Sequence, residues 1–84
     1  MDLNQLRSFV TVAQFVREVR TAGTSITVVK TTIGSAGSVA AAIDKAGWTD
    51  VAGTVSGDDT IFIATADARA QGRVLEQLRE AFGV

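Results

Sequence analysis

The run Ile26–Thr32 (ITVVKTT) constrains the fold more than any other segment, because every residue in it except Lys30 is β-branched. β-Branched side chains lose rotamer freedom in a helix and pack well on a pleated sheet, so the run predicts a strand. The preceding residues Phe15–Thr21 alternate loosely between apolar and polar and predict a second strand. The turn-forming residues Ala22–Ser25 lie between the two strands and indicate a β-hairpin.

A helix is predicted over Ala36–Ala46, after the small-residue loop Gly34–Ser38. Gly47 follows this helix, where a left-handed C-terminal cap belongs. The apolar residues at helical spacing are Ala36, Val39, Ala40 and Ile43. Such small side chains allow this helix to approach a sheet or a neighbouring subunit closely.

The second half of the chain repeats the order of two strands and a helix. Val51–Val55 and Thr60–Ala64 predict strands joined by a turn at Ser56–Asp59. Asp67 is a good N-cap for a last helix over Ala68–Phe82. The apolar side of that helix carries Val74, Leu75, Leu78 and Phe82.

Residues 15–84 therefore predict an α+β domain of two layers, in the order β-β-α-β-β-α, with a four-stranded antiparallel sheet and two helices on one face. The other face of the sheet is left to solvent or to a partner. Residues 1–14 form an N-terminal extension, for which a helix to about residue 13 is predicted, with Asp2 as its N-cap. Its apolar stripe at helical spacing is Leu3, Leu6, Val10 and Ala13.

Composition narrows the class of protein. A chain of 84 residues has room for one domain, and Ala and Val supply much of its 46% hydrophobic content, so we expect subunit association to complete the core. Without Cys or His, the chain has no disulfide or thiolate site and lacks the commonest metal ligand and general base. The net charge is −1 and the basic residues are spread evenly, which disfavours nucleic-acid binding. No signal peptide or membrane span is apparent, so we expect a cytoplasmic protein.

The turn Gly57-Asp58-Asp59 places two carboxylates at the tip of the second hairpin. Adjacent side chains in a turn diverge less than in a regular strand, and two close carboxylates are tolerated when a cation bridges them. A guanidinium suits this role, because its planar fork of donors pairs bidentately with carboxylate. From the residues alone, an ordinary turn is the favoured interpretation, because Gly and Asp are common turn residues.

Other kinds of site are less well supported by the residues. A cation site would draw oxygen ligands from Asp44, Asp50, Asp58 and Asp59, but their spacing matches no calcium-binding pattern. An enzyme would use the Asp pair as acid and base, with no His, Cys or Tyr to assist, so we expect no catalysis. The loop Gly34–Ser38 is open to two interpretations, tight packing or an anion held at a helix N-terminus. Trp48 is expected to cover the edge of the core, with ligand stacking or an interface as alternatives.

Two motifs resemble the C-terminal domain of bacterial arginine repressors. The first, Thr31–Asp44, is similar to a family stretch that reads Thr-x-Pro-Gly-x-Ala and ends on Asp. The second, Gly53–Ile61 (GTVSGDDTI), is similar to the family's Gly-Thr-Ile-x-Gly-Asp-Asp-Thr-Ile and lies at the expected distance from Asp44. Residues 15–84 can be laid over the family domain.

The resemblance implies a transcriptional regulator of arginine metabolism that forms trimers, two of which stack into a hexamer with L-arginine bound between them. It implies that Asp58 and Asp59 pair with the charge of the ligand, partly across the trimer interface. Asp44 is implied to face the α-amino end of the ligand, with Ala36 and its neighbour Gly37 beside it. L-Arginine is thus the expected effector, and no cofactor is expected.

The chain also departs from the family. Gly37 stands where a Gln usually holds the ligand, and Ile33 replaces the usual Pro, which loosens the loop. The family's winged-helix domain has no counterpart here, so we expect no direct DNA binding. Residues 1–13 (MDLNQLRSFVTVA) instead resemble the opening of the first helix of LysR-type regulators. An alternative function is therefore a structural oligomerisation domain, engineered or chimeric among other origins, that no longer binds arginine.

Overall fold

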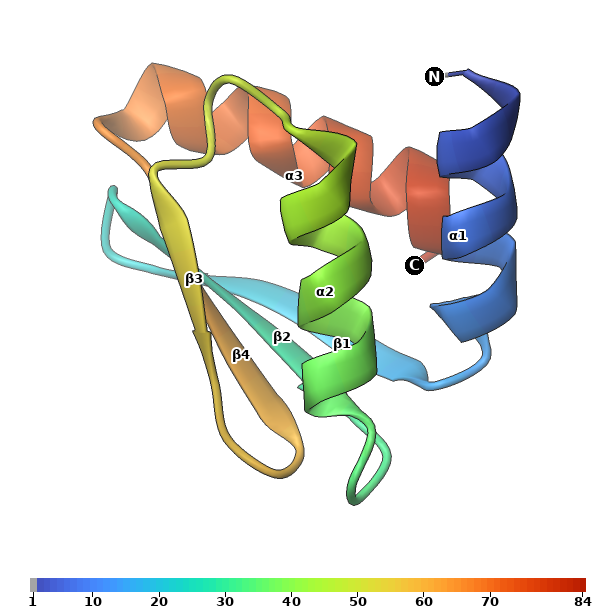
Figure 1. The fold of residues 1–84 in the computed structure, drawn as a ribbon. Helices are drawn as coiled ribbons and strands as arrows, with labels where there is room; N and C mark the ends of the chain where they lie inside the picture. Colours follow the sequence, from blue (N-terminus) through green and yellow to red (C-terminus); the bar gives the residue numbers. More distant parts are fainter. Residues whose placement is uncertain (1) are drawn as a thin grey trace.

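Four antiparallel strands and three helices make up the computed structural model, which describes residues 2–84. The elements are α1 (Leu3–Ala13), β1 (Val16–Ala22), β2 (Ile26–Thr31), α2 (Ala36–Ala46), β3 (Gly53–Ser56), β4 (Thr60–Ala64) and α3 (Ala68–Phe82). The strand order in the sheet is β1-β2-β4-β3, and the helices lie together on one side of it (Figure 1). The predicted α+β fold with an N-terminal helix is confirmed; Met1 lies outside the described residues.

The helix ends follow the capping residues that the sequence indicated. The side chain of Asp67 accepts a hydrogen bond from the amide of Ala70 at 2.9 Å, and that of Asp2 accepts one from Gln5 at 2.8 Å. Gly47 ends α2 in the left-handed region, with φ of 65°. None of the helices among residues 2–84 is long and apolar enough to cross a membrane.

The third strand is displaced from its predicted position. It runs over Gly53–Ser56 and not over Val51–Val55. The chain first makes a turn in which the amide of Val51 donates to the carbonyl of Trp48 at 3.1 Å. The side chains of Trp48 and Val51 both pack against the core, and this packing goes with a turn in place of the first residues of the predicted strand.

The core lies between the sheet and the helices. Val29, Ile61 and Ile63 of the sheet are fully buried against α2 and α3. The buried side chains of the two helices include Val39, Ile43, Val74 and Leu78. These are the faces that the helical spacing indicated, which is why the layer arrangement followed from the sequence pattern.

The face that α1 buries differs from the predicted stripe. Leu3, Leu6 and Val10 are 64%, 47% and 65% exposed, whereas Phe9 is completely buried. The ring of Phe9 stacks on Trp48 at 5.2 Å between centroids, and meets the edge of Phe82 at 5.4 Å. An aromatic ring buries more area than a single Leu, so the helix is rotated to place Phe9 between α2 and α3.

Replacing Phe9 tests whether α1 is part of the core. We expect Phe9→Ala to lower the free energy of unfolding by about 3–5 kcal/mol, because it leaves a cavity among aromatic rings. Leu3→Ala is the matched control on the same helix and should change it by less than about 1 kcal/mol, because Leu3 is exposed. Urea denaturation followed by Trp48 fluorescence measures both; equal effects would contradict the packing of α1.

Candidate functional site

The Asp pair lies in a closed turn between β3 and β4. The amide of Gly57 donates to the carbonyl of Thr60 at 2.8 Å and closes the turn. Asp58 is exposed and Asp59 is half-buried. The turn predicted at Ser56–Asp59 is confirmed, except that Ser56 is the last residue of β3. Both carboxylates are accessible from solvent.

Backbone hydrogen bonds fix this turn against the start of α2. The carbonyl of Asp58 accepts from the amides of Gly34 at 3.1 Å and Ala36 at 3.2 Å. Gly34 adopts a φ of +81°, a conformation that residues with a side chain rarely take. The loop is therefore shaped to receive the turn, and it places Asp58 and Asp59 next to the first residues of α2.

Two further predicted site residues lie at this junction. Ala36 is fully buried and contributes its side chain to the core. Gly37 is exposed, and a Cβ at that position would have no atom within 4 Å. The structure thus brings Asp58, Asp59, Ala36 and Gly37 together, with open space above Gly37.

Asp44 is not brought to this junction within one chain. It lies eight residues along α2 from Ala36, which corresponds to about 12 Å along the helix axis. Its carboxylate accepts a hydrogen bond from the hydroxyl of Thr54 at 2.8 Å.

Asp59 takes part in a network with two neighbouring side chains. The hydroxyl of Thr60 donates to Asp59 Oδ1 at 2.9 Å, and Lys30 Nζ donates to the Thr60 hydroxyl at 2.5 Å. Lys30 Nζ lies 3.7 Å from Asp59 Oδ1. The Thr60 hydrogen bond, with the charge of Lys30 as a smaller cause, lowers the pKa of Asp59 below its ordinary value.

The alternatives considered from sequence gain little from the structure. Within residues 2–84 no three acidic residues gather to hold a metal ion, and Asp50 is engaged by Arg73 through two hydrogen bonds of 2.9 Å. Within the loop Gly34–Ser38, the amides of Gly34, Ser35 and Ala36 donate to backbone carbonyls, so these three are not available to an anion. The expected place of Trp48 at the edge of the core is confirmed by its stacking on Phe9.

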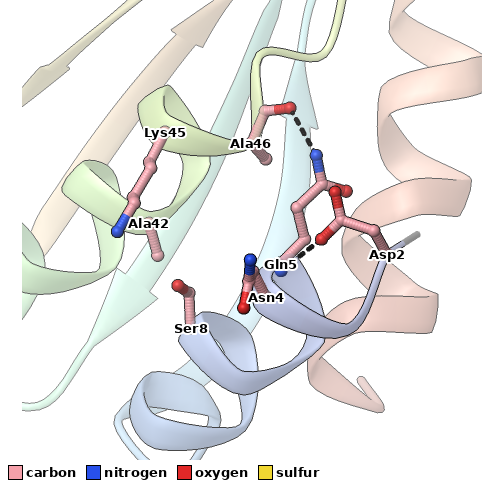
Figure 2. Close-up of a pocket in the computed structure, with 7 residues that line it drawn as sticks. All are labelled: Asp2, Asn4, Gln5, Ser8, Ala42, Lys45 and Ala46. Atoms are coloured by element: carbon pink, nitrogen blue, oxygen red, sulfur yellow. Dashed lines mark hydrogen bonds between the residues drawn. The ribbon is translucent and has the colours of Figure 1, made fainter.

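A hollow between two helices was not predicted from the sequence. Figure 2 shows it between α1 and α2, lined by Asp2, Asn4, Gln5, Ser8, Ala42, Lys45 and Ala46. The side-chain amide of Gln5 donates to the carbonyl of Ala46 at 2.9 Å and joins the two helices on one side of the hollow. None of the predicted site residues line this hollow. Another depression lies beside Asp59 and is lined by Arg17, Glu18, Lys30, Thr31, Ile33 and Asp59.

Comparison with known proteins agrees with the motifs around this junction. Residues 12–80 match the family model described as the C-terminal domain of the arginine repressor. The chain therefore belongs to the family of arginine repressor C-terminal domains. The match begins near the end of α1, so most of that helix precedes it.

Several arginine repressors are similar to the chain. The protein from Pelotomaculum thermopropionicum is 48% identical over 59 residues, which cover 70% of this chain and 39% of that protein. The one from Koribacter versatilis is 44% identical over 69 residues, covering 82% and 46% respectively. The one from Symbiobacterium thermophilum is 47% identical over 55 residues, covering 66% and 37%. The chain thus spans less than half the length of these relatives.

The pKa of Asp59 provides a test of the network. Its carboxyl should titrate below the ordinary aspartate range, so the stability it contributes is present above the pKa of the unfolded chain and lost as the pH falls through the lowered pKa. Thr60→Val should raise the titration midpoint of Asp59, because it removes the hydrogen bond that is the largest cause of the lowered pKa. Carbon NMR of the carboxyl groups between about pH 2 and pH 6 measures it.

Thr54→Val is the matched control. It removes a hydroxyl that donates to Asp44 and not to Asp59. The titration midpoint of Asp59 should therefore stay unchanged. A midpoint that does not move in Thr60→Val would mean that the Thr60 hydroxyl does not hold Asp59 in solution.

Proposed function

We propose that this chain is the L-arginine-binding and oligomerisation domain of a transcriptional regulator of arginine metabolism. The observation that carries the proposal is the pair Asp58 and Asp59, presented on a turn that backbone hydrogen bonds fix to the start of α2. Family membership supports the same assignment. The chain's lack of His, Cys and Tyr favours a binding role over catalysis.

The chemistry of the turn favours a guanidinium over a metal ion. Two neighbouring carboxylates offer four oxygens, which match the planar donors of a guanidinium. Asp58 makes no ion pair within residues 2–84, and so its carboxylate is available. A hard cation would need six to eight oxygen ligands, and no third acidic residue among those described joins the pair.

The outer face of the sheet supports self-association. Val55 and Phe62 are 74% and 53% exposed, and the strand register places them in one row with Val28. An exposed apolar face of this kind on a small domain usually marks a protein interface. The chain buries little area of its own, so covering this face with further copies would stabilise it.

The position of Asp44 supports a ligand site that is shared between copies of the chain. The turn of one copy would supply Asp58 and Asp59, and another copy would supply Asp44. Within one chain, Asp44 lies about 12 Å along the axis of α2 from Ala36, the residue next to the turn. Trimers that stack in pairs, as the family resemblance implies, provide such an arrangement. We assign no nucleic-acid contact to residues 2–84, because their basic side chains do not cluster in the sequence.

A purely structural oligomerisation domain is the second candidate. The observation that favours it is Gly37, which leaves open space where a side chain would otherwise reach a ligand. In that case the turn would still join β3 and β4 to α2, and the assembly would form without regard to arginine.

Arginine binding separates the two candidates. Calorimetric titration should give a binding isotherm with L-arginine at up to millimolar ligand, and Asp59→Asn and Asp58→Asn should each weaken binding by about tenfold or more, because each removes a charged acceptor. Glu76→Gln removes an exposed carboxylate on α3 and should bind as the parent does. If the parent chain shows no heat of binding and no thermal shift with L-arginine, the purely structural oligomerisation domain is the function that remains.

The assembly is tested at the outer sheet face. Phe62→Lys should shift the mass measured by sedimentation equilibrium from oligomer toward monomer, because it places a charge in the apolar row. Leu3→Lys alters a side chain that is also exposed, but on α1, and should leave the mass unchanged. A parent chain that is monomeric with and without arginine would contradict self-association.

A further inference from the structure

We propose that Lys30 is an internal competitor for the ligand-binding carboxylate of Asp59, and that its release onto Glu18 sets the affinity for a guanidinium. This inference rests on the proposed function, in which the turn at Asp58 and Asp59 binds the side chain of L-arginine. It adds a residue outside the turn and the start of α2 that tunes the site.

The ammonium of Lys30 lies beside the carboxylate that the proposed ligand would bind. This ammonium lies 3.7 Å from Asp59 Oδ1, and it donates to the Thr60 hydroxyl, which in turn donates to that same oxygen. A guanidinium bound to Asp59 would therefore stand within a few ångströms of a second positive charge. Repulsion between like charges at such a distance weakens binding unless Lys30 moves away.

A β-bulge in β1 provides Lys30 with a second carboxylate. Val16 pairs with Thr31, so a regular antiparallel ladder would place Arg17 opposite Lys30. The register shifts between Val16 and Glu18, and Glu18 takes the place opposite Lys30. Like charges directly opposite each other destabilise a sheet, so the bulge replaces a repulsive pair with an attractive one.

The two carboxylates lie on either side of Lys30 in one depression. Glu18 and Asp59 both line it together with Lys30. Glu18 now accepts hydrogen bonds from Arg20 and remains 44% exposed, so it has room for a second donor. Exposed ion pairs differ little in free energy, so Lys30 exchanges Asp59 for Glu18 at a small cost. A guanidinium on Asp59 shifts Lys30 toward Glu18 by differential charge repulsion alone.

Removing the competitor should strengthen binding. We expect Lys30→Met to bind L-arginine about three- to tenfold more tightly than the parent in calorimetric titration. Agmatine, which carries the guanidinium without the carboxylate, should gain by the same factor, because the repulsion acts on the guanidinium. Lys45→Met removes an exposed charge from α2 and should leave both affinities unchanged. Lys30→Arg should stay close to the parent.

Removing the second carboxylate should have the opposite effect. Glu18→Gln leaves Lys30 with Asp59 alone, and we expect binding of both ligands to weaken by about two- to threefold. Unchanged or weaker binding of L-arginine by Lys30→Met would overturn the inference. If Lys30→Met binds L-arginine more weakly but binds agmatine as the parent does, the inference is overturned, because Lys30 then pairs with the carboxylate of the ligand. If neither the parent nor Lys30→Met binds arginine, the proposed function itself has failed.

Discussion

The carbonyl of Asp58 is the point on which the arrangement of this domain depends. It accepts the amides of Gly34 and Ala36 and so joins the second hairpin to the loop that opens α2. These bonds use only the backbone, and they leave the Asp58 carboxylate free. Together with the pairing of β2 and β4, Asp58 thus joins the two halves of the fold, and it also presents a charge to solvent. Because the backbone makes the structural contacts, the side chains of this short turn are left for the proposed binding site.

Much of the fold could be predicted because local signals agreed with each other. The β-branched run at β2, the Asp67 cap and the Gly47 end of α2 each specify one local conformation. The face of α1 could not be predicted in the same way. Its apolar residues cover more than one side of the helix, and the choice of Phe9 over Leu3 depends on aromatic partners that are distant in sequence. Similarly, β3 begins late because tertiary packing of Trp48 and Val51 overrides a short apolar pattern.

The candidate site was predictable in part. The turn follows from its Gly and Asp residues, and the resemblance to the arginine repressor family implied that it lies close to Ala36. The contact of Lys30 with Asp59 could not be inferred, since it depends on the pairing of β2 with β4. The bulge that brings Glu18 opposite Lys30 is likewise a property of the ladder and is not encoded in either strand alone. Nor does sequence spacing reveal that Asp44 points to Thr54, away from the turn.

The placement of all three helices on one face of the sheet has a further consequence. Figure 1 shows that residues 2–84 begin at α1 and end after α3, so both of these ends lie in the helix layer. An assembly that buries the sheet faces at its centre would carry those ends on its periphery. Any domain or label joined to either end would then be displayed outward, clear of the contacts between copies. In such an assembly, domains of different sizes could be joined to the ends without disturbing the contacts between copies at the centre.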